Sequence, residues 1–397
     1  MPPHIREVRI WNYKSLAQVA ATLEPFTALV GQNGAGKSNF MDALAFVQES
    51  LSGSVELAFK TRGGIGAVRR KSGGHPTNIS IRLVLDLEQG CAADYSFEIA
   101  AKPGEKFRIA KERCVVRRPM HPDAVLEIQN GKFTHEIAGI RASLPPDRLA
   151  LFVVSATPEF KPVYDFLVTM RSYSVLPLRL RELQDADPGE GEFLARDGSN
   201  AATVLKRIQS HDDGGRYERL CRILGKAVRG IKSVEYRPVG QKETLRFKQD
   251  VGQKHPWRFD ALNMSDGTLR LLGLLLAVYQ PGKPSVIALE EPEATVHPAI
   301  AELIVQVLME ASHERQILVT THSPDILDYR DLTDSQIRVV TVQGNETLIA
   351  PISQGGRDAI REHLYTAGEL LRLNELNPDL KAAEAAGKKP VQLDLGC

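Results

Sequence analysis

The sequence has no long hydrophobic run, no cysteine motif and no signal peptide. Its longest apolar stretch, Leu269 to Tyr279, contains Arg270 and is shorter than the about 18 residues of a membrane-spanning helix. The N-terminus MPPHIREVRI lacks the apolar core of a secretory signal. No CxxC spacing links the four cysteines, which excludes a zinc site and a disulfide framework: Cys91, Cys114, Cys221 and Cys397. These absences predict a reduced, cytoplasmic protein.

The chain also has almost no net charge and no repeated unit. It contains 50 Lys+Arg and 49 Asp+Glu, so its overall charge does not indicate a nucleic-acid partner, and any such surface must be local. No internal repeat or long heptad run is present, which excludes a coiled-coil arm. A chain of 397 residues is long enough to form two lobes with sizeable cores.

One motif with a specific chemical meaning is present near the N-terminus. The apolar run Phe26 to Val30 leads into GQNGAGKS, which has the form GxxxxGK[ST], and a helix-periodic segment follows. In such a loop backbone N–H groups surround phosphates, Lys37 reaches the β- and γ-phosphates, and the Ser38 hydroxyl ligates Mg²⁺. A chance glycine-rich turn is the alternative, but strand, spacing and helix all agree. The predicted ATP-binding residues of this loop are Gly31, Asn33, Gly34, Gly36, Lys37, Ser38 and Asn39.

Acidic residues follow a second apolar strand, Ser285 to Leu289. Glu290 comes first after this strand and is expected to face Mg²⁺, while Glu291 is placed to accept a proton from attacking water. The alternative is that both acids are merely exposed in a loop, and the P-loop upstream disfavours this interpretation. A third apolar strand, Gln316 to Thr320, precedes His322. A lone histidine is usually structural, but the carboxyl end of a strand in an α/β sheet is where ligands bind, which favours γ-phosphate sensing.

The remaining patterns predict a mixed architecture. Alternating apolar and polar residues at Ile5 to Ile10 predict a first strand. Period-two alternation further along the chain predicts an antiparallel sheet: Ile79 to Leu85, Tyr95 to Ile99, Phe107 to Val116 and Val125 to Ile128. The apolar run Leu149 to Val154 is interpreted as a buried strand of the main sheet. Residues 164–227 have a helical pattern, interrupted by an acidic Pro/Gly loop at Asp185 to Glu192. Strands return at Ser233 to Arg237 and Thr244 to Lys248, and the residues beyond Pro378 are typical of a polar, disordered tail.

A basic segment lies within the predicted antiparallel sheet. Residues 60–118 contain 13 Lys+Arg and 6 Asp+Glu, and the strand around residues 102–118 carries several of the cations. Alternation would place these on one face, where they would follow a DNA backbone. An ordinary solvated sheet face is the other interpretation, and the sequence alone favours it slightly.

Four motifs in order, GQNGAGKSN, NMSDGTLR, VIALEEPE and LVTTHSPD, resemble those of the ATP-binding-cassette ATPases of the RecF, SMC and OLD group, and more narrowly the compact RecF-like ATPases of bacteria. The resemblance runs from about residue 5 to 378. It implies that Glu290 is the Walker B acid, Glu291 the catalytic glutamate and His322 the switch histidine. It further implies that Ser265 and Gly267 cap the γ-phosphate of ATP bound by an opposite subunit, and that Arg62 approaches the nucleotide.

The chain departs from the pattern of this group at three points. Asp266 replaces the first signature glycine and places a carboxylate near a polyphosphate, which weakens dimer closure unless a cation compensates. Glu290 stands where an aspartate is usual. No glutamine after Val154 fits the loop that couples the lobes in such ATPases.

Together these observations predict an α/β protein: a P-loop NTPase with an ABC-ATPase head, an antiparallel β subdomain and an inserted helical lobe, without a long coiled coil. The expected divisions are 1–160 and 233–378 for the head, 161–232 for the lobe and 379–397 for the tail. The expected function is slow, Mg²⁺-dependent ATP hydrolysis in a head-to-tail homodimer that gates DNA or protein binding, in DNA repair or genome defence. The alternative is a low-turnover scaffold that controls a nuclease or other effector supplied in trans; a transporter subunit is a weaker third hypothesis.

Overall fold

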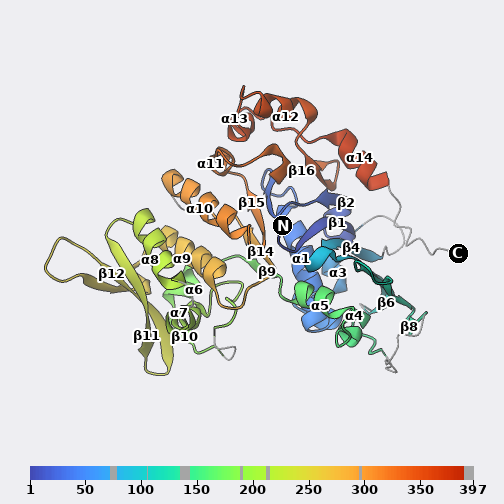
Figure 1. Ribbon diagram of the computed structural model, residues 1–397, viewed down its shortest axis with the longest axis horizontal. Helices are drawn as coiled ribbons and strands as arrows, with labels where there is room; N and C mark the ends of the chain where they lie inside the picture. The colour runs from blue at the N-terminus through green and yellow to red at the C-terminus, as the bar shows by residue number, and fades with distance from the viewer. Residues whose placement is uncertain are drawn as a thin grey trace.

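A six-stranded, mostly parallel sheet forms the centre of the molecule, in the order β17-β16-β3-β15-β14-β9 (Figure 1). The computed structural model describes residues 1–71, 78–104, 106–134, 144–187, 191–211, 215–294 and 297–388. The strands of this sheet are β3 (Phe26–Val30), β9 (Arg171–Tyr173), β14 (Val286–Glu290), β15 (Gln316–Thr321), β16 (Ile337–Gln343) and β17 (Glu346–Pro351). All neighbours pair in parallel except β16 and β17, which are antiparallel.

Both faces of the central sheet are covered, so its strands consist largely of buried apolar residues, as in other parallel sheets. Leu29 and Leu318 face one hydrophobic core, which includes α1 (Lys37–Ser52), α4 (Ala150–Val154) and α5 (Lys161–Val168). Ala28 and Ile317 face a second core, which includes α9 (Asp266–Tyr279) and α10 (Pro298–Ala311). The helix after the P-loop and the helix after Ser265 therefore lie on opposite faces of the sheet.

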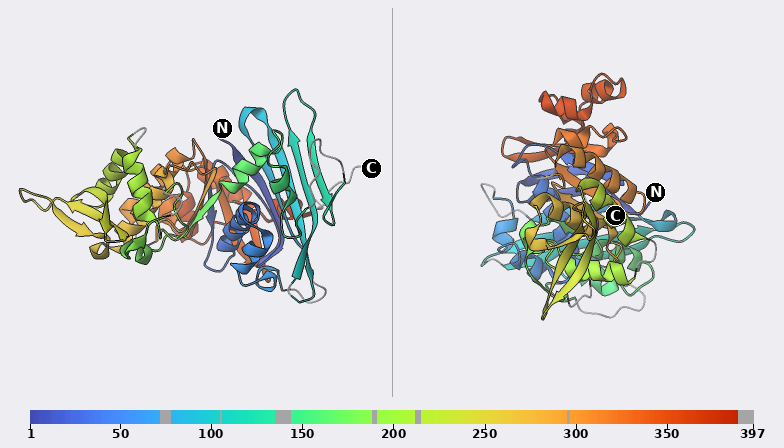
Figure 2. Two further views of the ribbon diagram at one scale, coloured as in Figure 1. Left: turned by 90° about the horizontal axis from the view of Figure 1, so that it is seen from below. Right: turned by 90° about the vertical axis from the view of Figure 1, so that its left-hand side faces the viewer.

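A seven-stranded sheet packs on the α1 side in the order β2-β1-β4-β5-β6-β7-β8, at the right of the left-hand view in Figure 2. Its neighbouring strands are antiparallel, so the expected antiparallel sheet is confirmed. Phe46 of α1 contacts Tyr13 and Phe97 of this sheet at ring-centroid distances of 5.7 and 6.5 Å. The strands are β1 (His4–Tyr13), β2 (Leu16–Thr22), β4 (Ile79–Asp86), β5 (Ala92–Lys102), β6 (Lys106–Arg117), β7 (Ala124–Gln129) and β8 (Lys132–Phe133).

The interpretation of Leu149 to Val154 as a strand is wrong, because this run forms α4. The buried carboxylate of Glu112 accepts hydrogen bonds from the backbone N–H groups of Ala150 (2.5 Å) and Leu151 (2.9 Å), where a strand would bond to its neighbour. The Tyr95 hydroxyl donates to the same carboxylate at 3.0 Å. Burial raises the pKa of Glu112 to about 7, although these three donors favour its charged form.

Glu112 should make the stability of the protein depend on pH. The folded state binds its proton more tightly than the unfolded state, so the stabilisation is fully present below about pH 4.5 and is lost as the pH rises through about 7. Relative to the Glu112→Gln variant, which does not titrate, wild type should lose about 3 kcal/mol between pH 4.5 and 8. Urea unfolding of both proteins across this range measures the difference. A difference that does not change with pH would contradict the assignment.

A third sheet and three helices form the lobe at the left of Figure 1. The pattern at residues 164–227 predicts helices interrupted by one acidic loop at 185–192, but the structure also places the short strands β9 and β10 there. Strands of two or three residues show no periodicity. The boundaries of the domains stay a prediction. The elements of this lobe are α6 (Pro177–Arg181), β10 (Gln184–Asp185), α7 (Ala201–Ser210), α8 (Arg216–Ala227), β11 (Ile231–Val239), β12 (Lys242–Gln249) and β13 (Trp257–Asp260).

The tail is also more ordered than its composition predicts. A helix, α14 (Leu380–Lys388), lies against β2 and β17, and Asp379 accepts a hydrogen bond from the backbone N–H of Ala382 (3.0 Å) at its start. Small alanine side chains let this helix approach the sheet edge, so disorder is the wrong expectation for 380–388; residues 389–397 lie outside the described part. The remaining elements are α2 (Val55–Lys60), α3 (Ile65–Val68), η1 (Glu88–Gly90), η2 (Ala261–Asn263), α11 (Pro324–Leu327), η3 (Asp334–Gln336), α12 (Gln354–Arg361) and α13 (Ala367–Arg372).

The sequence predicts no membrane-spanning helix, no coiled-coil arm and no disulfide framework. Within the described residues, no helix is long and apolar enough to cross a bilayer, and none forms a long coiled coil. Cys91, Cys114 and Cys221 are free thiols, whereas Cys397 lies outside the described residues.

Candidate nucleotide-binding site

The predicted P-loop, the two acids Glu290 and Glu291, and His322 lie at one edge of the central sheet. The P-loop follows β3, His322 follows β15, and Glu290 and Glu291 lie at the end of β14. These three strands are parallel neighbours, so their carboxyl ends share an edge, where ligands bind in α/β sheets. The backbone N–H of Gly31 donates to the carbonyl of Thr321 at 3.4 Å, which joins the P-loop to the end of β15.

Two glycines of the P-loop are needed for packing as well as for conformation. Gly36 has φ +107°, and a Cβ there would lie 2.2 Å from the Thr347 hydroxyl of β17. A Cβ at Gly31 would lie 2.0 Å from the carbonyl oxygen of Val340 in β16. The loop is thus pressed against the β16–β17 hairpin, which fixes its path.

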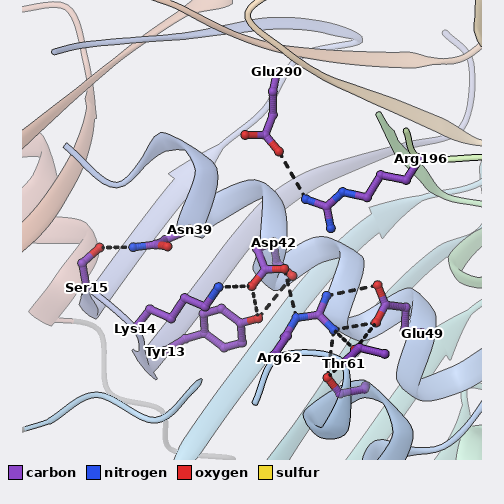
Figure 3. Close-up of polar contacts among 11 residues, drawn as sticks. Tyr13, Lys14, Ser15, Asn39, Asp42, Glu49, Thr61, Arg62, Arg196 and Glu290 are labelled. Atoms are coloured by element: carbon purple, nitrogen blue, oxygen red, sulfur yellow. Dashed lines mark hydrogen bonds and ion pairs between the residues drawn. The ribbon is translucent and has the colours of Figure 1, made fainter. Parts of the chain in front are cut away.

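The other loop residues differ in exposure and contacts. Asn33, Gly34 and Ser38 are exposed, and Gly34 has φ +80°. Asn39 is turned to the side and donates through Nδ2 to the Ser15 hydroxyl at 2.8 Å (Figure 3). Ser15 lies 2.7 Å from Thr347, so Asn39 helps to attach the P-loop to the same hairpin.

Lys37 places a cation inside the loop. Its ammonium is buried and donates to the carbonyls of Gly31 (2.7 Å) and Gln32 (3.0 Å). Burial lowers the pKa of Lys37, while the nearby carboxylates Glu291 and Glu293 oppose this shift. A positive charge among backbone N–H groups at a helix N-terminus is suited to bind a polyphosphate.

Glu291 and His322 form a pair. His322 Nδ1 lies 3.3 Å from Glu291 Oε1, and both side chains are partly exposed. The backbone of Glu291 has φ +44°, which is unusual for a residue other than glycine. Its N–H donates to the carbonyl of Thr320 at 3.0 Å, which holds this conformation. A carboxylate aimed at solvent and oriented by a histidine is suited to accept a proton from water.

The sequence reasoning missed Glu293, the third acid of the EEPE motif. Its side chain is buried, and the Thr321 hydroxyl donates to its Oε1. Within the described residues its Oε2 has no hydrogen-bond partner. Burial raises the pKa of Glu293, opposed by the Thr321 hydrogen bond. Its presence in the motif was the only sequence signal, and that motif does not distinguish a buried acid from an exposed one.

Glu290 already has a cationic partner in the same chain. Arg196 Nη2 lies 3.3 Å from Glu290 Oε1 (Figure 3). In the part of the chain that the structure describes, no group of three or more His, Cys, Asp or Glu residues forms a metal site. One carboxylate, Glu290, and the exposed hydroxyl of Ser38 fit Mg²⁺, which proteins usually bind with one or two carboxylates together with substrate phosphates and water.

The signature residues lie at the start of α9, on the other face of the central sheet from α1. Ser265 is the N-cap, and its Oγ accepts a hydrogen bond from the backbone N–H of Thr268 at 3.3 Å. Gly267 lies in the first turn of this helix. The carboxylate of Asp266 is 2.5 Å from Arg181, which also donates to the carbonyl of Met264 at 2.8 Å. The cation that Asp266 requires is therefore present, although the sequence did not identify Arg181.

The structure gives Arg62 a contact that differs from the implied one. Its guanidinium is buried and is held by Asp42 (2.9 Å) and Glu49 (2.5 Å), both on α1, as Figure 3 shows. It also stacks on Phe46, with 5.5 Å between the guanidinium carbon and the ring centroid. Arg62 thus fixes the α2–α3 segment against α1. A contact with nucleotide would require these ion pairs to break and stays a prediction.

Comparison with known proteins agrees with this geometry. A family model described as "AAA domain, putative AbiEii toxin, Type IV TA system" matches residues 26–328. The chain belongs to this family of AAA-domain proteins. The match covers all three strand ends that carry the predicted nucleotide site, together with the signature segment, so the resemblance to ABC-type P-loop ATPases of the SMC and RecF group is confirmed.

Curated relatives and solved structures extend the comparison. The chain is 28% identical over 119 residues to structural maintenance of chromosomes protein 1 of Schizosaccharomyces pombe, and 30% identical over 115 residues to that of Arabidopsis thaliana. Each match covers 26% of this chain and 9% of the relative's length. Two solved structures share the fold: an Smc head bound to the C-winged helix domain of ScpA (TM-score 0.55, 16% identity, 89% of this chain and 99% of that chain) and the Pyrococcus furiosus Smc head with an extended coiled coil, bound to the C-terminal domain of ScpA (0.56, 14%, 91% and 99%).

Lys37→Ala should weaken ATP binding about 10- to 100-fold, because the loss of a charged hydrogen bond costs about 1.5–3 kcal/mol. Calorimetry with ATP measures the affinity. Lys60→Ala, which removes an exposed lysine of α2, is the control and should bind as wild type does. Equal affinities for Lys37→Ala and wild type would refute the P-loop assignment.

Proposed function

We propose that this chain is an Mg²⁺-dependent ATPase whose two copies join head to tail when ATP binds. The observation that carries the proposal is the Glu291–His322 pair, which lies on the strand ends beside the P-loop and near Lys37. Family membership supports nucleotide binding. Hydrolysis also needs an oriented base, and the Glu291–His322 pair supplies one.

Each residue then has a defined task. Lys37 binds the β- and γ-phosphates, and Glu291 takes the proton of the attacking water while His322 holds its carboxylate. Glu290 and Ser38 would hold Mg²⁺, which neutralises phosphate charge when bound. Glu293, buried beside Thr321, keeps the β14 and β15 ends in register and contributes negative potential near Lys37.

The dimer is proposed because the signature segment belongs to a different layer from the P-loop. Ser265 begins α9 on one face of the central sheet, and α1 covers the other face. A second copy placed head to tail would bring its Ser265 and Gly267 to the phosphates held by Lys37. The Arg181–Asp266 ion pair supports this arrangement, since it neutralises the carboxylate that would otherwise repel a polyphosphate.

Light scattering tests the dimer directly. The mass should be 43.8 kDa without ATP and twice that value with Mg²⁺ and ATP, at protein concentrations well above the dimer dissociation constant. Adding duplex DNA in a parallel sample shows whether DNA changes the assembly. A mass that stays at 43.8 kDa with saturating ATP would contradict the proposal.

We further propose that ATP binding gates a protein partner, in a setting of genome defence. One of the similar structures is an Smc head bound to the C-winged helix domain of ScpA, which supports a protein partner for this fold. The family description names a toxin of a Type IV TA system, which supports defence. Pull-down of the proteins encoded beside this chain, with and without ATP, tests the gate; ATP-independent capture would contradict it.

DNA binding along the basic strand receives less support from the geometry. Arg108, Lys111, Arg113 and Arg117 are exposed or partly exposed on β6, and a register shift separates Arg108 from the alternating Lys111, Arg113 and Arg117. However, Lys111 lies 4.0 Å from Glu98 and Arg117 lies 3.9 Å from Asp123. Arg113 stands opposite Glu127 in the register of β6 and β7. Acids interleaved with the cations are typical of a solvated face.

We expect neutralising these four cations to change DNA affinity little. Filter binding or fluorescence anisotropy of the Arg108→Gln, Lys111→Gln, Arg113→Gln and Arg117→Gln quadruple variant, at several salt concentrations, measures affinity and salt slope together. If the strand does follow a phosphate backbone, affinity should instead fall for all sequences alike and the salt dependence should become shallower. That outcome would establish β6 as a DNA surface.

A further inference from the structure

The segment Leu194–Gly198 connects the predicted metal site with the second lobe. It runs beside the end of β9, where the backbone N–H groups of Ser174 and Leu176 donate to the carbonyls of Arg196 (2.9 Å) and Asp197 (3.1 Å). Because β9 is the parallel neighbour of β14, this segment lies next to the end of β14 and Glu290. It then continues into α7 of the lobe.

Arg196 crosses from this segment to the acid that the proposed function assigns to Mg²⁺. Its guanidinium lies 3.3 Å from Glu290, and its side chain is 47% exposed whereas that of Glu290 is 20% exposed. Figure 3 shows the two side chains pointing toward each other, apart from the Asp42–Arg62 cluster. Among the residues that the structure describes, Glu290 is the ion-pair partner of this guanidinium, and an exposed guanidinium in a single ion pair can move away at little cost.

The segment Leu194–Gly198 also contacts α6. Asp197 lies 3.3 Å from the guanidinium of Arg179, and a Cβ at Gly198, which has φ +83°, would lie 2.5 Å from a methyl carbon of Leu180. At the end of the same helix, Arg181 holds Asp266 and the Met264 carbonyl beside Ser265. A continuous series of contacts therefore runs from Glu290 through Arg196 and α6 to the signature segment.

We propose that Arg196 is a positioning residue that competes with Mg²⁺ for Glu290. When metal and nucleotide bind, Arg196 is released from Glu290, and α6 transmits this change to the signature segment. This rests on the proposed function, since it needs nucleotide at the P-loop. A guanidinium and a divalent cation repel each other at one carboxylate, so both cannot bind it closely. The contact also supplies the coupling between lobes for which the sequence offers no glutamine.

Magnesium dependence provides the first test. Calorimetry measures the Mg²⁺ concentration that half-saturates binding of a non-hydrolysable ATP analogue. Arg196→Met keeps an unbranched side chain and removes the charge, so the half-saturating concentration should fall about two- to fivefold. Arg222→Met, at an exposed arginine of α8, is the matched control and should leave it unchanged. An unchanged or higher Mg²⁺ requirement in Arg196→Met would overturn the proposal.

Amide hydrogen exchange provides a second test that does not depend on activity. Without nucleotide, Arg196→Met and Glu290→Gln should each speed exchange in residues 174–182, and the double variant should add nothing further, because both remove the same contact. In wild type, Mg²⁺ with the analogue should produce the same change, whereas the analogue alone should not. If neither variant nor Mg²⁺ with the analogue alters the exchange of residues 174–182, the proposal is overturned even if the analogue binds normally. Failure of wild type to bind the analogue at all would instead refute the ATPase assignment, and so the two failures are distinguishable.

Discussion

Glu291→Gln is expected to lower ATP turnover about 10²- to 10⁴-fold while ATP still binds, because an amide cannot accept the proton of the attacking water. The substitution should not move the side chain, because Thr320 fixes the backbone of residue 291 and the glutamine should therefore occupy the same place. Steady-state phosphate release gives the turnover and calorimetry the affinity. The ATP-bound dimer should accumulate, since binding continues while its breakdown does not.

A control distinguishes this effect from a general loss of charge. Glu314→Gln changes an exposed acid just beyond α10 and should hydrolyse ATP at the wild-type rate. The same experiment decides between the ATPase and the low-turnover scaffold. If wild type is no faster than Glu291→Gln, ATP acts only as a structural ligand, and the scaffold that controls an effector in trans is the better description.

The nucleotide motifs could be predicted from sequence because each is local. The eight residues from Gly31 to Ser38, and the acids that end β14, are continuous with the strands that present them. A parallel sheet then brings the strand ends together without any further information. This is why the order of motifs was sufficient to predict the fold class.

The electrostatic partners could not be predicted in the same way. Arg196 lies 94 residues before Glu290 in the sequence, and Arg181 lies far from Asp266 as well. Arg196 lies in a loop and Arg181 at the end of the short helix α6, both near β9, a strand of only three residues that has no detectable period. Pairs of this kind depend on the packing of two lobes, which single-sequence patterns do not contain.

Two errors of secondary structure have a similar origin. Leu149 to Val154 is as apolar as a buried strand, and the residue that makes it a helix, Glu112, comes from β6 in the antiparallel sheet. The alanine-rich segment after Asp379 looks soluble and unstructured alone, yet it forms a helix because β2 and β17 offer it a surface. In both cases a distant contact decided between two local conformations.

Ser265→Arg is expected to abolish ATP-dependent dimerisation without preventing ATP binding. Within one chain the serine only caps α9, so its replacement should cost about 1 kcal/mol of stability. If it also completes the site of a second copy, the bulky cation would occupy the space that the γ-phosphate must enter. Light scattering should then show 43.8 kDa with saturating ATP, while calorimetry still detects binding. Ser210→Arg, at the exposed end of α7, is the control and should dimerise normally.

Mixing Ser265→Arg with Glu291→Gln provides the sharper experiment. In a head-to-tail heterodimer one site combines both defects, and the other combines the intact Glu291 of one chain with the intact Ser265 of the other. Hydrolysis should therefore reappear in the mixture, to at most half the wild-type activity per heterodimer, although each variant alone is inactive. Mixtures that stay inactive while heterodimers demonstrably form would exclude independent composite sites. A Ser265→Arg monomer with full activity would show that one chain contains a complete catalytic site, and the dimer would then have no part in the chemistry.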